Sequence, residues 1–124
     1  MPRNPAMSNA SCELLGGFFA ILAHGTRMRI FCAVHERPRT VTEIAAYSCV
    51  SITNASQHLR LMRDRGAVVA EKRGQSVYYR IADSRFVEAV MLIRETLVDG
   101  LQRSTAEASA PARLRRRARA LRIA

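Results

Sequence analysis

The chain has 124 residues, 48% of them hydrophobic, which is enough for one small domain with a modest core. Its 20 Lys and Arg against 10 Asp and Glu give a formal net charge of +10, and nearly all of the cations are Arg, which favours a polyanionic partner such as nucleic acid. Three cysteines cannot all pair within one chain, which argues against a disulfide-stapled secreted domain and favours the cytoplasm. No segment approaches a membrane-spanning length, which argues against a membrane protein.

Two helices are predicted before residue 40, after a loose polar arm over residues 1–9. In the first helix, Gly16 and Gly17 each cost about 1 kcal/mol relative to Ala, so they indicate a kink or the close approach of another backbone. The second helix starts after His24 and stops at the Arg-Pro-Arg of residues 37–39. Its inward-facing residues are expected to be Met28, Phe31, Cys32 and Val34.

Residues 40–81 predict a helix, a turn, a second helix and a short hairpin, which is the order of a winged helix-turn-helix. Val41, Ile44 and Ala45 form the apolar side of the first of these helices, and residues 49–51 interrupt it. Ser51 can cap the following helix with its hydroxyl. The expected fold class is mainly α with a β-hairpin wing.

The helix after Ser51 has two different faces. Ala55, Leu59 and Met62 fall at positions i, i+4 and i+7 and form one buried stripe. The opposite stripe is polar and consists of Thr53, Ser56, Gln57 and Arg60, with Asn54 and His58 on its flanks. Such side chains can donate to and accept from base edges or phosphates, so this face predicts a DNA-recognition helix.

The hairpin that follows ends in basic residues. Residues 67–73 are β-prone, Gly74-Gln75 makes the turn, and residues 76–81 return. Lys72, Arg73 and Gln75 therefore stand near the tip, where a wing contacts the backbone or minor groove of DNA. The alternative is a surface hairpin with solvated charges, but the position directly after a polar-faced helix favours a DNA wing.

A long helix is predicted after Asp83 or Ser84, and it carries an apolar seam with spacings of four, three, four and four. The seam consists of Phe86, Val90, Ile93, Leu97 and Leu101. Such a seam needs a partner helix, so we expect this helix and the first one to form a two-fold homodimer interface.

The pattern ends at residue 104, and the last fourteen residues hold six Arg and no acidic residue. These arginines are either solvated or condensed on phosphates that flank the binding site. The predicted organisation is a flexible arm over residues 1–9, a DNA-binding and dimerisation domain over residues 10–103, and an Arg-rich tail over residues 104–124.

Several segments of the chain are similar to the ArsR/SmtB family of bacterial repressors. They are residues 22–30 (LAHGTRMRI), residues 51–63, the Gly-Ala-Val of residues 66–68 and residues 74–79 (GQSVYY), and the resemblance covers about residues 12–101. The resemblance implies a homodimeric winged-helix repressor that sits on an imperfect inverted repeat and leaves it when an inducer binds. The inducible switch comes from the resemblance, not from the spacing of residues.

The metal sites of that family are not matched. Its arsenic and cadmium sites use Cys-x-Cys where residues 40–42 here are Thr-Val-Thr, and threonine supplies no thiolate. Its zinc and nickel ligand positions are filled here by Asp83, Arg85, Thr96 and Asp99, and an arginine repels a cation. The histidines His24, His35 and His58 show no ligand spacing. We therefore predict no metal and no other cofactor.

The cysteines are candidate thiol sensors. Cys12 and Cys32 match positions in the family's sulfide- and redox-responsive branch, which adds a partner thiol near the end of the last helix. Val98 stands in that partner's place, so the usual pair is broken. Cys49 lies in the turn of the helix-turn-helix, where a sulfur adduct could spoil docking without a partner thiol. For each thiol the alternative is a structural or spectator role.

The sequence thus predicts a DNA-binding repressor whose partners are double-stranded DNA and a second copy of the chain, with a reactive sulfur species or oxidant as the inducer. The residues expected at DNA are Ser51, Thr53, Asn54, Ser56, Gln57, His58, Arg60, Lys72, Arg73 and Gln75. The alternative is a constitutive architectural DNA binder with structural cysteines. An enzyme is not predicted, because no nucleophile–base cluster and no Cys-x-x-Cys motif is visible.

Overall fold

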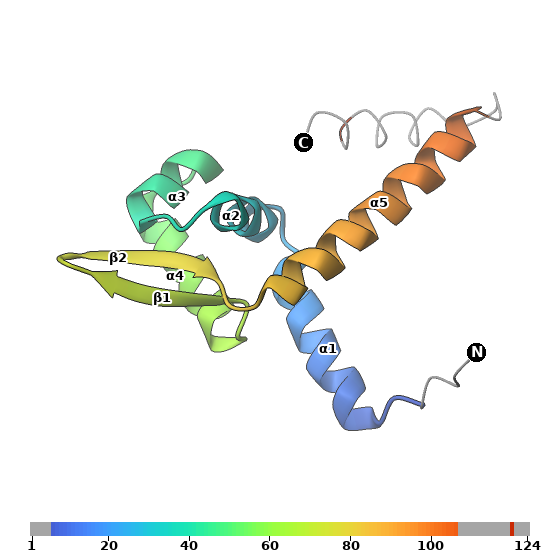
Figure 1. Cartoon of the computed structure of the whole chain (residues 1–124), viewed down its shortest axis with the longest axis horizontal. Coiled ribbons are helices and arrows are strands. Elements are labelled where there is room, and N and C mark those ends of the chain that lie inside the picture. The colour runs from blue at the N-terminus through green and yellow to red at the C-terminus, as the bar shows by residue number, and fades with distance from the viewer. Residues whose placement is uncertain (1–5, 107–119, 121–124) are drawn as a thin grey trace. The chain divides into compact units, whose positions relative to one another are not determined.

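The computed structural model describes residues 6–106 and residue 120 and contains five helices and one β-hairpin in this part of the chain (Figure 1). In chain order the elements are α1 (Asn9–Leu22), α2 (Gly25–Glu36), α3 (Val41–Ser48), α4 (Ile52–Asp64), β1 (Val68–Arg73), β2 (Ser76–Ile81) and α5 (Ser84–Ala106). The chain divides into two compact units, Met1–Ser84 and Arg85–Ala124. Among the described residues, no helix combines the length and the apolar character needed to span a membrane.

Local capping explains where the helices of the first unit begin. The Ser8 hydroxyl accepts a hydrogen bond from the Ser11 amide at 3.2 Å, and the Ser51 hydroxyl accepts one from the Asn54 amide at 3.0 Å. The Thr40 hydroxyl accepts from the Glu43 amide at 3.3 Å, with the Thr-x-x-Glu spacing of a capping box. The Ser51 cap predicted from the sequence is therefore confirmed.

The core of the first unit lies where α2, α3, α4 and the hairpin meet. Its largest fully buried side chains are Phe31, Ile30, Ile44, Leu59, Met62 and Val68. Cys32 does not join this core, and the expectation that it faces inward is wrong because the cysteine is exposed. Ile30, Ala33 and Val34 take the inward positions, and a residue two places after Ile30 faces the other side of a helix.

Within the described residues of one chain, no other backbone approaches the glycine pair of α1. The helix runs without a break from Asn9 to Leu22, and Gly16 faces open space. A Cβ placed on Gly17 would lie 3.2 Å from a guanidinium nitrogen of Arg65. The neighbour at Gly17 is thus a flexible side chain, where the sequence suggested another backbone or a kink.

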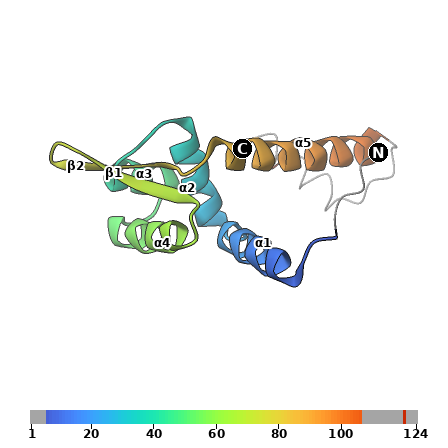
Figure 2. The ribbon, with the colours of Figure 1, turned by 60° about the horizontal axis from the view of Figure 1, so that its bottom comes forward.

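The hairpin has the strands and turn that the sequence predicted. β1 and β2 are antiparallel, with Val68 opposite Ile81 and Arg73 opposite Ser76, so Gly74 and Gln75 form a two-residue turn. Gly74 has φ +62°, a value that only glycine adopts without strain, and it occupies the first central position as in a type II′ turn. The hairpin projects past α3 and α4 (Figures 1 and 2).

In the second unit, the described structure is the single helix α5 together with residue 120. No residue of α5 is buried, and Leu92, Ile93 and Leu97 are exposed. The helix continues through Ala106, so the first three residues of the predicted tail, 104–106, are helical. Most of the Arg-rich tail predicted for residues 104–124 lies outside the described residues.

Candidate nucleic-acid interface

The polar face of α4 is open to solvent. Ala55, Leu59 and Met62 are buried at no more than 1% exposure and fix which side of the helix points to the core. The residues predicted for the opposite side are all exposed, namely Ser51, Thr53, Asn54, Ser56, Gln57 and Arg60. The buried stripe therefore orients a row of hydrogen-bonding side chains outward, at the height of the first turns of the helix.

His58 departs from this outward row. It is half-buried, and its ring centroid lies 4.9 Å from that of His24, whose Nδ1 accepts a hydrogen bond from the Thr26 amide at the start of α2. Burial lowers the pKa of His58 below its ordinary value, and the charges of His24 and Arg27 lower the pKa further. Its Nδ1 is buried without a hydrogen-bond partner among the described residues. His58 thus links α4 to α2, and of the ten predicted DNA-contact residues it is the least accessible.

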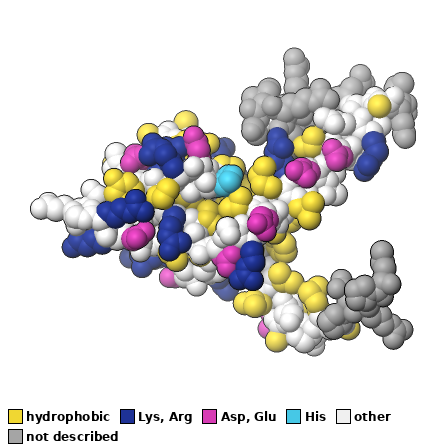
Figure 3. Space-filling model, in the orientation of Figure 1, with side chains coloured by type: hydrophobic (Ala, Val, Ile, Leu, Met, Phe, Trp, Pro, Cys, Tyr) yellow, Lys and Arg dark blue, Asp and Glu magenta, His cyan; other side chains and the backbone are white. Residues whose placement is uncertain are grey.

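The wing presents its charges at the far end of the hairpin. Lys72, Arg73 and Gln75 are exposed, and Figure 3 shows Lys and Arg side chains gathered over this part of the molecule. The Arg73 guanidinium lies 3.4 Å from a Glu71 carboxylate oxygen and 5.2 Å from the centre of the Tyr78 ring. Because exposed ion pairs contribute little, Arg73 can exchange Glu71 for a phosphate at small cost.

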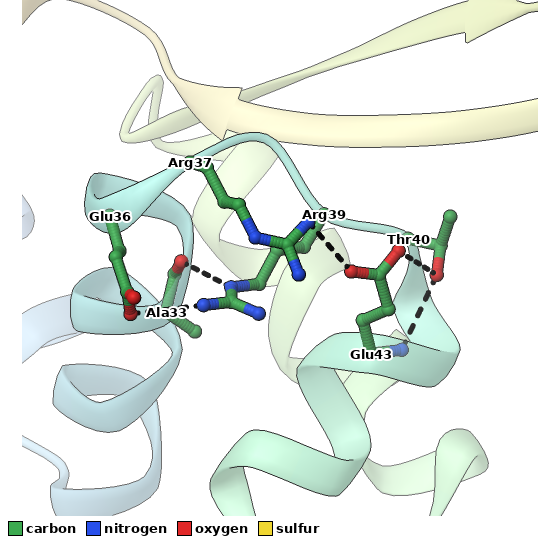
Figure 4. Close-up of polar contacts among 6 residues, drawn as sticks. All are labelled: Ala33, Glu36, Arg37, Arg39, Thr40 and Glu43. Carbon is green, nitrogen blue, oxygen red and sulfur yellow. Dashed lines mark hydrogen bonds and ion pairs between the residues drawn. The ribbon is translucent and has the colours of Figure 1, made fainter.

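The wing is joined to the helices through Arg39, which the sequence indicated only as part of a helix stop. The Arg39 amide donates to the Tyr79 carbonyl at 3.1 Å, and the Tyr79 amide donates back to the Arg39 carbonyl at 2.8 Å. The buried guanidinium donates to the Ala33 carbonyl at 2.7 Å and to Glu36 at 2.9 Å (Figure 4). It also lies 5.1 Å from the centre of the Tyr47 ring. Arg39 therefore ties α2, α3 and β2 together.

Beside the joint, a neighbouring Arg makes a looser contact. The Arg37 guanidinium lies 3.1 Å from a Glu43 carboxylate oxygen, on the first turn of α3 (Figure 4). Both side chains are well exposed to solvent, at 58% and 34%. The contrast between Arg37 and Arg39 shows how one short loop holds both a structural cation and a solvated one.

A pocket of about 350 Å³ lies between α4 and β2. Its lining consists of Ser56, Arg60, Arg63, Asp64 and Tyr79. Ser56 and Arg60 belong to the predicted recognition face, whereas Arg63, Asp64 and Tyr79 were not among the predicted DNA-contact residues. The i, i+3 spacing of Arg60 and Arg63 is visible in the sequence, but the position of Tyr79 beside them depends on how the hairpin folds back.

The three thiols lie on exposed residues, and none of them is in a disulfide. Cys49 has φ +58°, a left-handed conformation that residues other than glycine seldom adopt, and its amide donates to the carbonyls of Ala45 and Ala46 at the end of α3. Cys12 lies in the first turn of α1, and Cys32 on the outer side of α2. Within residues 6–106 and 120, no three His, Cys, Asp or Glu side chains are grouped as a metal site would require.

Comparison with known proteins also points to a helix-turn-helix protein. A family model described as a helix-turn-helix domain matches residues 22–71. The transcriptional repressor SmtB homolog of Synechocystis is 32% identical over 98 residues, which cover 79% of this chain and 71% of that protein.

Solved structures agree with this match. The crystal structure of Rv0081 from Mycobacterium tuberculosis has a TM-score of 0.70 and 32% identity, and covers 77% of this chain and 96% of that one. The solution structure of the homodimeric winged helix-turn-helix DNA-binding domain of Mb0332 from Mycobacterium bovis, a possible ArsR-family transcriptional regulator, has a TM-score of 0.73 and 25% identity. It covers 83% of this chain and 95% of that one.

Proposed function

The chain belongs to the ArsR/SmtB family of winged helix-turn-helix transcriptional regulators, and we propose that it is a homodimeric repressor that leaves its operator when a chemical signal reaches it. The observation that carries this proposal is the solvent-exposed polar face of α4 directly beside a basic hairpin. One of its relatives is a transcriptional repressor, which supports repression rather than activation of transcription. A DNA partner and exposed thiols both suit the cytoplasm.

In the proposed complex, α4 enters the major groove with Thr53, Ser56, Gln57 and Arg60 near the bases. The wing lies beside it, where Lys72, Arg73 and Gln75 hold the DNA backbone. Ser51 caps the helix end that enters the groove, and Asn54 lies on the same exposed turn. His58 contributes through the packing of α4 on α2 more than through direct contact, because it is half-buried.

We propose that α1 and α5 form the dimer interface. Leu14 is 77% exposed on α1, and Leu97 is 55% exposed on α5, values that a monomer in water would seldom tolerate along two helices. A second copy related by a two-fold axis would cover both helices, and the homodimeric Mb0332 domain supports this arrangement. Two copies would then read half-sites about one helical turn, or a multiple of it, apart.

For the signal, we propose modification of a thiol by a reactive sulfur species or an oxidant, with Cys32 as the first candidate. Thiol reactivity requires solvent access, and Cys12, Cys32 and Cys49 all have it. Val98 occupies the place of the last-helix thiol found in the family's sulfide-responsive branch, so an adduct on one cysteine would have to act without that partner.

The alternative is a constitutive architectural DNA binder, which the net charge of +10 favours. Such a protein would bind random DNA almost as tightly as its own promoter, because contacts to phosphates carry no sequence information. Its cysteines would be structural, and no reagent directed at thiols would release it.

The test is fluorescence anisotropy of the reduced protein on the DNA upstream of its own gene, before and after treatment with an organic polysulfide. We expect release of the wild type and retention by Cys32→Ser, with Cys12→Ser and Cys49→Ser as matched controls. Specific binding that ignores the treatment would remove the thiol switch and leave the repressor. Equal affinity for upstream and random DNA would instead favour the architectural protein.

A further inference from the structure

The pocket between α4 and β2 combines positive charge with hydroxyl groups. Arg60 and Arg63 are three residues apart on α4, so they project from the same side of the helix, and both are exposed. Ser56 and Tyr79 add hydroxyl groups to the same lining. The only acidic side chain in the lining is Asp64, which leaves a formal charge of +1. A volume of about 350 Å³ exceeds what a single oxyanion needs, so a group attached to a larger ligand also fits.

The pocket is held at a defined place in the fold. Tyr79 is fixed by its two backbone hydrogen bonds with Arg39, and Arg39 is itself anchored to α2 through Ala33. The α4 side of the pocket is fixed by the buried residues Leu59 and Met62, which alternate with the lining residues along the helix. The backbone on each side of the pocket is therefore held by hydrogen bonds or core packing, and such preorganisation lowers the cost of binding.

Its position along α4 indicates which part of DNA it would meet. A recognition helix reads base edges mainly with its N-terminal turns, and its later turns approach the sugar-phosphate backbone. Arg63 and Asp64 are the last two residues of α4. Arg63 and Tyr79 therefore lie where α4 would approach the backbone, while Ser56 and Arg60, earlier on the helix, remain near the bases.

We propose that this pocket binds one phosphodiester of the DNA backbone in each half-site, and that Arg63 and Tyr79 are DNA contacts in addition to the recognition face and the wing tip. A phosphate held by both α4 and β2 fixes the depth and register of α4 in the groove. This inference rests on the proposed function, because it requires DNA to lie along α4.

The experiment starts from a duplex that the full-length protein selects from a random-sequence library. On this duplex, Arg63→Ala is expected to lower affinity roughly 10-fold and to reduce the slope of log affinity against log salt by about 1. Arg65→Ala is the matched control, because it removes the same charge only two residues further along the chain. The Arg65 side chain lies against Gly17 of α1, outside the pocket. Its effect on the salt slope should be clearly smaller.

The second arm replaces single phosphates of the duplex with neutral methylphosphonates. At one phosphate in each half-site, the wild type should lose affinity while Arg63→Ala loses no more, so the two changes are not additive. Tyr79→Phe should show the same coupling in weaker form. Tyr78→Phe should not, because successive residues of a strand point to opposite faces and Tyr78 stacks with Arg73.

Additive effects at every phosphate, with binding that still depends on Gln57, would overturn the pocket assignment and leave the proposed function standing. Competition by inorganic phosphate at constant ionic strength, lost in Arg63→Ala and combined with additive methylphosphonate effects, would assign the pocket to a free anion and overturn its assignment to DNA. If no duplex is selected from the library, the proposed function fails and this inference fails with it.

Discussion

Gln57 and its neighbour Leu59 show how two residues separated by one position serve different purposes on α4. Leu59 is buried at 1% exposure and holds the helix on the core, whereas Gln57 is exposed and carries an amide that can both donate and accept. Such an amide can bind adenine through two hydrogen bonds in the major groove. The proposed base reading by α4 therefore depends on which side of the helix is buried.

We predict that Gln57→Ala costs about 1–3 kcal/mol of binding free energy and relaxes the preference at one base position. Arg73→Ala is the control, because loss of a phosphate contact should weaken all sequences to the same degree. The measurement is the affinity of both variants for a set of single-base operator mutants. A Gln57→Ala profile that only shifts down, with its sequence preferences intact, would show that Gln57 reads no base.

His58 makes the stability of the first unit depend on pH. Its pKa in the folded protein is lowered below the ordinary value of 6.5, by burial first and by His24 and Arg27 next. The unfolded chain therefore binds more protons between the two pKa values, and stability rises with pH in that window. The contribution of His58 to the free energy of unfolding is complete above pH 6.5. It is lost as the pH falls toward and through the lowered pKa of His58 in the folded protein.

We predict that urea unfolding of the wild type between about pH 8 and about pH 5 shows this loss, and that His58→Gln shows a smaller one. His24→Gln separates the contribution of the neighbouring ring, whose centroid lies 4.9 Å from that of His58. Identical pH dependence of the wild type and His58→Gln would contradict the prediction.

Among the elements, the position of the wing depends on the short loop between α2 and α3, in which Arg39 forms a β-bridge with Tyr79. Arg39 pairs with Tyr79 through the backbone and with Ala33 and Glu36 through its guanidinium. Its side chain is only 10% exposed, and its hydrogen bond to the Ala33 carbonyl is made away from water. An uncompensated carbonyl at Ala33 would be costly for the same reason.

We predict that Arg39→Ala lowers the free energy of unfolding by about 2 kcal/mol and weakens DNA binding because the wing loses its anchor. Arg37→Ala removes the same charge from the same loop but breaks only the solvated pair with Glu43, so it should cost at most about 0.5 kcal/mol. The measurement is denaturant unfolding together with anisotropy on the selected duplex. Equal costs for the two variants would show that burial of Arg39 does not stabilise the joint.

At the scale of the whole molecule, α1 and α5 each carry exposed apolar side chains, which we propose are covered in the dimer. Leu97 and Ile93 remain exposed on α5, and Leu14 and Phe19 remain exposed on α1. Burying a leucine side chain contributes about 1.5–3 kcal/mol, so several such residues on each of two copies suffice for a stable dimer.

We predict that Leu97→Glu converts the dimer to a monomer, as measured by sedimentation equilibrium, and reduces operator affinity because only one half-site can be held at a time. Ile52→Glu is the control, since it places the same charge at an equally exposed apolar residue on α4 and should leave the dimer intact. A Leu97→Glu protein that sediments as a dimer would place the interface elsewhere.

Local features of this protein could be predicted from the sequence. The buried stripe of α4, the Ser51 cap and the turn at Gly74 each depend on residues within four positions of one another, so periodicity and capping chemistry were sufficient to predict them. The family resemblance rested on the same local segments. Exposed polar residues such as Gln57 followed from the position of the stripe.

Contacts between distant segments could not be predicted from sequence patterns, because they depend on how the elements pack. Arg39 became buried because Ala33, Tyr47 and Tyr79 surround it, and no local pattern joins those positions. His58 moved away from the DNA-facing row because α2 brings His24 against it. Cys32 is exposed because other apolar residues of α2 occupy the side of the helix that faces the core. The pocket forms because β2 places Tyr79 near Arg63. Each of these features depends on packing between elements, and the hydrophobic period of a single element carries no information about that packing.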